Sequence, residues 1–155
     1  MSTAILRKAG ITVRRFLLAI TICSSLISNS QRWYPDSMMR ALTSAYGIKR
    51  VDITNAVSKF YWTQNYDSSV LYANRALGIA KELNYIAGEA EAFRNLGVTS
   101  IYKGLKEPEV KPFLDKAILL FKSLGDKKGM ADTYNNFGSM WMNFQNYPYS
   151  LIFFD

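Results

Sequence analysis

From about residue 49 onward, apolar residues recur every three or four positions, in runs separated by short polar or glycine-containing breaks. This spacing places the apolar side chains of each run on one face of an α-helix. The runs comprise Ile53, Ala56, Val57, Phe60 and Tyr61; Val70, Ala73, Ala76, Leu77, Ala80 and Leu83; a stretch over residues 86–103; Val110, Phe113, Leu114, Ala117, Ile118 and Phe121; and Met130, Tyr134, Phe137, Gly138 and Trp141. The pattern predicts an all-α fold of amphipathic helices joined by short turns.

The breaks between the runs predict where these helices begin and end. A turn at residues 65–67 separates the first two runs, and Asp67 or Ser68 supplies the N-cap of the helix that follows. Gly104 ends the helix over residues 86–103. Pro112 fits poorly inside a helix, so the regular part of the next helix is expected to start near it.

One segment of the chain returns at a fixed distance. Residues 83–97 reappear 41 positions later as residues 124–138. Five of the 15 aligned positions are identical, where average residue usage predicts about one. These are Leu83/Leu124, Gly88/Gly129, Ala90/Ala131, Asn95/Asn136 and Gly97/Gly138. A period of this length predicts a stack of similar helix pairs, because one pair cannot bury its apolar face alone.

Composition excludes several kinds of chemistry. The 155 residues fit one domain, contain no histidine and contain one cysteine, so we expect no metal site, no cofactor and no disulfide. No paired carboxylates, phosphate loop or nucleophile motif is present, and we expect a protein that is not an enzyme. The net charge of +7 includes four basic residues ahead of Phe16; without them, 15 basic residues stand against 12 acidic ones. We therefore expect no nucleic-acid partner.

The first thirty residues have the three-part layout of a secretory signal peptide. Arg14 and Arg15 precede a mostly apolar stretch over residues 16–27, and Ser28 and Ser30 supply small side chains before a cleavage site. This layout predicts export to a periplasmic or other extracytoplasmic location. An uncleaved membrane anchor and a buried N-terminal helix are the alternatives.

The Leu-Gly-Asp segment at residues 124–126, followed by a helix of the pattern Ala-x-x-x-Asn-Asn-Phe-Gly, resembles the tetratricopeptide repeat in its long bacterial variant. The resemblance implies an α-solenoid of antiparallel helix pairs, with about two and a half to three repeats; another helix-hairpin array is the alternative. The implied divisions are 1–30 (signal peptide or anchor), 31–48 (lead-in helix, helical from Asp36 to Tyr46) and repeats at 49–85, 86–126 and 127–155, the last incomplete. The family's small residue, which lets paired helices pack closely, falls at Val57, Gly97 and Gly138.

Aligning the first helices of the repeats puts an asparagine at the same place in each, namely Asn55, Asn95 and Asn136. In the family, first helices line a concave groove and this asparagine binds the backbone of an extended peptide. A carboxamide both donates and accepts hydrogen bonds, so it suits that task. The alternative is that each asparagine bonds a neighbouring helix within the stack.

Five further residues are expected in the same groove. Arg94 is the only cation among the expected lining, and Asn135 is a second polar group. Tyr61, Trp62 and Tyr102 either anchor an apolar ligand side chain or belong to the core.

These patterns predict a non-catalytic scaffold that binds a protein or peptide segment. The alternative is the sensor region of a bacterial signal-transduction protein whose output domain, a histidine kinase, cyclase or transcriptional regulator, lies beyond residue 155. The modest charge of residues 31–155 disfavours a third alternative, an RNA-binding repeat. Repeat stacks need a capping element, so we also expect self-association through the C-terminal edge.

Overall fold

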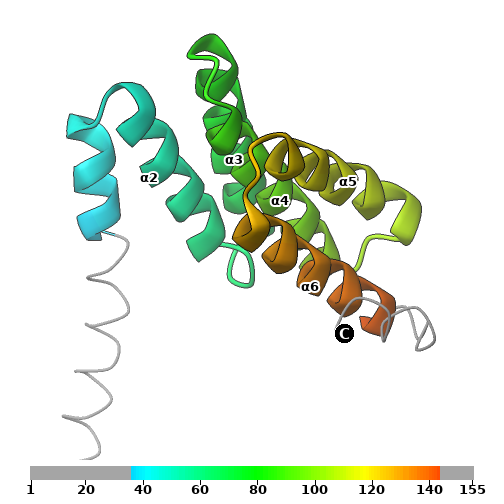
Figure 1. The fold of residues 1–155 in the computed structure, drawn as a ribbon. Helices are drawn as coiled ribbons and strands as arrows, with labels where there is room; N and C mark the ends of the chain where they lie inside the picture. The colour runs from blue at the N-terminus through cyan, green and yellow to red at the C-terminus, as the bar shows by residue number, and fades with distance from the viewer. Residues whose placement is uncertain (1–35, 144–155) are drawn as a thin grey trace, which may run out of the picture. The chain divides into compact units, whose positions relative to one another are not determined.

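The computed structural model describes residues 36–143, and every regular element in that range is a helix (Figure 1). Residues 36–44 are helical, and α2 (Gly47–Phe60), α3 (Tyr66–Glu82), α4 (Ile86–Lys103), α5 (Glu107–Ser123) and α6 (Lys127–Asn143) follow. The predicted all-α class is therefore confirmed. The predictions for residues 1–35 and for the C-terminal edge after residue 143 lie outside the described residues.

Within the unit that begins at Met38, each helix packs against the next one in the chain. In addition α2 contacts α4 and α4 contacts α6, whereas α3 and α5 make no contact with each other in the part that the structure describes. The helices α2, α4 and α6 thus form one layer, called the inner layer below, and α3 and α5 lie outside it. No helix between residues 36 and 143 is long and apolar enough to cross a membrane.

Small residues allow α4 and α5 to approach closely. A Cβ atom added to Gly97 would lie 2.4 Å from Cδ2 and 2.8 Å from Cγ of Leu114, which is fully buried. Such distances are far below van der Waals contact, so only glycine fits here without movement of the buried Leu114 side chain. The predicted role of Gly97 in close helix packing is confirmed.

The crossing of α2 and α3 uses hydroxyl groups. Ser58 Oγ donates to the carbonyl of Ser69 at 2.9 Å, and Ser69 Oγ donates to the carbonyl of Ser58 at 3.0 Å. The only proton of Ser69 Oγ is used in this way, so Thr99 Oγ1 on α4 donates to it, at 2.6 Å. All three side chains are buried, and their mutual bonds remove the cost of burying polar groups.

The apolar stripes meet in three clusters that join successive helices. Val51, Ala76, Ala80 and Ala92 connect α2, α3 and α4; Ala90, Ala117 and Phe121 connect α4 and α5; Ile101, Val110, Leu114, Phe137 and Met140 connect α4, α5 and α6. The predicted stripe on α2 is wrong in part. Ala56 is exposed and Ile53 is half-buried, while polar Thr54 and Asn55 are buried because hydrogen bonds satisfy them.

Two predicted helix starts are also wrong. The N-cap of α3 is Asn65, whose Oδ1 accepts a hydrogen bond from the backbone N–H of Ser68 at 2.9 Å, and not Asp67 or Ser68. The helix α5 begins at Glu107 and contains Pro112. Glu109 explains the early start, because its carboxylate accepts from the backbone N–H of Lys106 at 3.2 Å and holds the first turn.

Candidate functional site

Asn55 on α2 and Asn95 on α4 are hydrogen-bonded to each other inside the inner layer. Nδ2 of Asn95 donates to Oδ1 of Asn55 at 3.0 Å and to its backbone carbonyl at 3.1 Å. Nδ2 of Asn55 donates to the carbonyl of Gly88 on α4 at 3.0 Å. The two residues are only 6% and 1% exposed. Their carboxamides therefore tie α2 to α4, which is the stacking role that the sequence left open as the alternative to ligand binding.

The third asparagine of the series lies in a different environment. Asn136 on α6 is half-buried, and its side chain makes no hydrogen bond to any residue between 36 and 143. The adjacent Asn135 is exposed, and its carbonyl accepts from Ser139 Oγ at 3.0 Å. Unlike Asn55 and Asn95, Asn135 and Asn136 on α6 do not use their carboxamides to join the described helices.

Arg94 joins α4 to α6 through carboxylates. Its guanidinium contacts Glu91 Oε2 at 2.6 Å and Asp132 Oδ2 at 3.2 Å, and its Cζ lies 6.0 Å from the ring centroid of Phe121. The residue is 6% exposed. Since two carboxylates already balance this buried charge, Arg94 is placed to hold the inner layer together.

Asp132 is shared between two cations. Lys128 donates to its Oδ2 at 2.8 Å, and this bond, followed by the charge of Arg94, lowers the pKa of the Asp132 carboxyl group. The same bond raises the pKa of the Lys128 ammonium group. Asp132 therefore stays ionised over the neutral and mildly acidic range.

The three aromatic candidates have different surroundings. Tyr61 stacks against Tyr72 of α3 with ring centroids 6.1 Å apart, so it belongs to the contact between α2 and α3. Trp62 is half-buried, with the Lys59 ammonium 5.3 Å from its ring centroid. Tyr102, near the end of α4, is 60% exposed. Of the three, Tyr102 offers the most surface to a ligand.

The exposed Tyr102 lies at the same end of the helix stack as Trp62. Lys103, the next residue on α4, has its Nζ 3.6 Å above the ring of Tyr66 at the start of α3. This contact brings the end of α4 beside the turn between α2 and α3, where Trp62 lies. Tyr102 near the end of α4 and Trp62 in the turn after α2 thus lie toward the same end of the packed helices.

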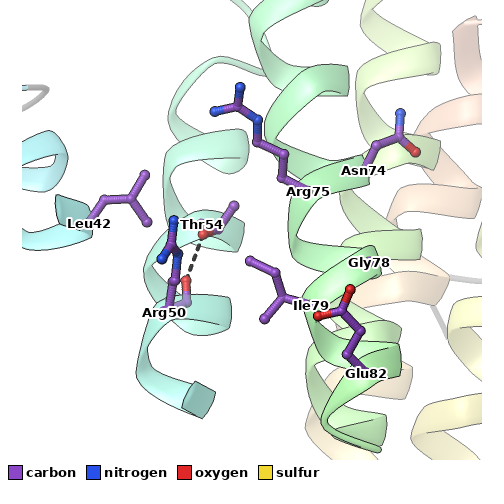
Figure 2. A pocket seen from close by; sticks show the side chains of 8 residues that line it. All are labelled: Leu42, Arg50, Thr54, Asn74, Arg75, Gly78, Ile79 and Glu82. Atoms are coloured by element: carbon purple, nitrogen blue, oxygen red, sulfur yellow. Dashed lines mark hydrogen bonds between the residues drawn. The ribbon is translucent and has the colours of Figure 1, made fainter. Parts of the chain in front are cut away.

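A cleft that sequence reasoning missed lies between residues 38–44, α2 and α3 (Figure 2). It has a volume of about 320 Å³ and is lined by Leu42, Arg50, Thr54, Asn74, Arg75, Gly78, Ile79 and Glu82. The two arginines are 25 positions apart and belong to two different helices, α2 and α3. Comparing only the first helices of the repeats could not have paired them.

Among residues 36–143, no group of three or more His, Cys, Asp or Glu side chains is placed to hold a metal ion. Among the candidates, Asn55, Asn95 and Arg94 are engaged in hydrogen bonds or ion pairs between helices. No protein-family model matches the chain, and no curated protein is similar enough to count as a relative.

Proposed function

We propose that this chain is a non-catalytic scaffold that binds a protein or peptide segment across the inner layer of a tetratricopeptide-like stack. Support comes from the contacts between helices: α2, α4 and α6 touch in sequence, while α3 and α5 do not touch in the described part. The inner helices are therefore spaced more closely than the outer ones. Stacked helix pairs with this difference curve toward their inner layer and present an extended binding surface.

The proposal divides the candidate residues by role. Asn55, Asn95 and Arg94 are buried and bonded between inner helices, so they fix the spacing of the layer. Asn136 and the exposed Asn135 are the polar groups that remain for a peptide backbone. A rigid inner layer lowers the entropy cost of binding, because the surface is already ordered.

The observation that carries the proposal is the exposure of Tyr102 beside the turn that contains Trp62. The Tyr102 side chain is 60% exposed although it belongs to a helix of the inner layer. Most of its surface is therefore not buried in the core. Tyrosine and tryptophan are the residues most enriched among binding hot spots, where their truncation costs about 2 kcal/mol or more. We assign Tyr102 as the main anchor and Trp62 as its neighbour.

Peptides selected from a random displayed library against the full-length protein test this function. The affinity of a selected peptide is then measured by isothermal titration calorimetry with wild type, Tyr102→Ser and the matched control Leu119→Ser. Leu119 on α5 is 57% exposed, so it loses a similar apolar surface away from the inner layer. Tyr102→Ser is expected to weaken binding about tenfold or more, and the control to change it less than about twofold. Equal effects of the two variants, or a library that yields no binder, would refute the proposal.

A further inference from the structure

Two arginine side chains from different helices flank the cleft between residues 38–44, α2 and α3. Arg50 projects from α2 and Arg75 from α3, and both are exposed (Figure 2). Neither forms an ion pair with a carboxylate of the described residues, in contrast to Arg94. The Cζ of Arg75 lies 5.6 Å from the ring centroid of Tyr72, which limits where its guanidinium can turn.

The walls of the cleft are held by contacts among the three helices. Tyr72 Oη on α3 donates a weak hydrogen bond to Sδ of Met39, at 3.6 Å, and so joins α3 to the helical residues 38–44. Thr54 Oγ1 donates to the carbonyl of Arg50 at 2.6 Å, so this hydroxyl is used within α2. The cleft is thus a feature of packed helices, and its volume of about 320 Å³ falls at the lower end of the range for small-molecule sites.

The lining combines cations with apolar and amide groups. Leu42 and Ile79 supply apolar surface, and Gly78 leaves open space, since a Cβ added there would meet nothing within 4 Å. Asn74 adds an amide that can donate hydrogen bonds. A guanidinium presents paired N–H donors whose geometry matches a carboxylate or a phosphate. Two guanidinium groups with no carboxylate partner therefore favour an oxyanion.

Glu82 limits which anions fit. It lies seven residues beyond Arg75 on α3, about 10 Å along the helix axis, and Figure 2 shows it toward the other end of the lining. With two arginines and one glutamate the lining carries a net charge of +1. The Glu82 carboxylate repels a ligand that is anionic along its whole length. A ligand with one anionic group and an otherwise polar or apolar structure avoids this repulsion.

We propose that this cleft binds a small organic anion, whose carboxylate or phosphate group is held by Arg50 and Arg75 and whose remainder lies over Ile79 toward Glu82. The cleft shares α2 with the inner layer but uses none of the side chains assigned to peptide binding, so the proposal does not depend on the proposed function. A scaffold with both sites would bind a macromolecular segment and a small anion at once.

Titrations of the protein with inorganic phosphate and with succinate test the proposal. The titrations are monitored by heteronuclear NMR, with the ionic strength kept constant by sodium chloride. Saturable shifts are expected in the amides of α2 and α3 around the cleft. A stronger response to phosphate would assign a phosphorylated ligand, and a stronger response to succinate a carboxylic acid. If neither anion gives saturable shifts in wild type, the proposal is wrong.

The double variant Arg50→Gln/Arg75→Gln is expected to weaken the binding about tenfold or more, since hydrogen bonds from a charged guanidinium to an oxyanion are stronger than neutral ones. The matched control Lys49→Gln/Lys81→Gln removes the same charge from the same two helices outside the cleft. Equal loss in both double variants would show general charge attraction and overturn the proposal. A second variant, Arg75→Lys, keeps the charge but removes the paired donors, and it serves as the test if the double variant fails to fold. It is expected to weaken anion binding several-fold. Unchanged binding in Arg75→Lys would contradict the assigned geometry.

Discussion

The close approach of α4 and α5 at Gly97 predicts opposite effects of the same substitution at two glycines. Gly97→Ala places a Cβ 2.4 Å from Cδ2 of Leu114 and is expected to destabilise the fold. Gly78→Ala on α3 places a Cβ where nothing lies within 4 Å, and it is expected to stabilise the fold. Both positions are inside helices, so the change in helix propensity is the same for both.

The magnitudes follow from two competing terms. Replacing glycine by alanine inside a helix stabilises it by about 0.8–1.0 kcal/mol. At Gly97 this gain is opposed by overpacking, which costs about 1–3 kcal/mol when a buried neighbour has to move. Leu114 is 0% exposed and cannot move toward solvent. We expect Gly97→Ala to lower the free energy of unfolding by about 1 kcal/mol, and Gly78→Ala to raise it by about the same amount.

Urea unfolding followed by far-ultraviolet circular dichroism measures both changes. The slope of the free energy against urea concentration should stay the same in both variants, because neither changes the surface exposed on unfolding. If Gly97→Ala is as stable as wild type or more stable, α4 and α5 do not pack as closely as described. If Gly78→Ala is destabilising, α3 is not an open helix surface at that position.

Three further predictions concern single contacts. Asn65→Ala removes the N-cap of α3 and should lower the free energy of unfolding by about 1 kcal/mol, whereas Asn65→Asp should keep it. Ser69→Ala leaves the Thr99 hydroxyl without its acceptor and should cost about 1–3 kcal/mol. Lys128 first, and then Arg94, lower the pKa of Asp132 in the folded state, so this carboxylate stabilises the fold above its unfolded pKa and stops doing so as pH falls through the folded value. Stability should therefore decrease below about pH 4, and less steeply in Asp132→Asn.

Each of these has a measurement that decides it. Chemical unfolding at neutral pH serves for the cap and for the buried hydroxyl. An Asn65→Ala protein with wild-type stability would show that the Oδ1 contact with Ser68 does not cap the helix. A Ser69→Ala protein within 0.5 kcal/mol of wild type, the usual scatter of surface substitutions, would mean that the hydroxyl group is not buried as described. Parallel pH dependences of wild type and Asp132→Asn would contradict the ion pairs at that carboxylate.

The helices could be predicted from the sequence because the signals that define them are local. The first helix of the second pair was expected over residues 86–103, and α4 spans the same residues. The apolar residues spaced three and four positions apart, together with Gly104 at the C-cap, are enough to predict this helix and its end. The cap of α3 was harder, since Asn65, Asp67 and Ser68 are all good capping residues and only the backbone of the turn selects one.

The candidate site could be predicted less well, because burial depends on which faces neighbouring helices cover. Asn55 could bind a peptide or a neighbouring helix as far as the sequence shows, and only the packed structure reveals that it is buried and bonded to α4. Arg94 was expected to be the cation of a groove, but its partner Asp132 lies 38 positions away. Arg50 and Arg75 line one cleft only because α2 packs on α3, and no repeat or motif links them.

The central claim is that a peptide segment binds across the inner layer, beside Tyr102. A photo-crosslinking aromatic amino acid placed at position 102 tests it most directly, with position 119 on α5 as the control, because both side chains are well exposed. A library-selected peptide is added, the samples are irradiated, and the adducts are identified by mass spectrometry. The account predicts a specific adduct at position 102 that unlabelled peptide suppresses, and none at position 119. A peptide that binds but cross-links at position 119 and not at position 102 would contradict it.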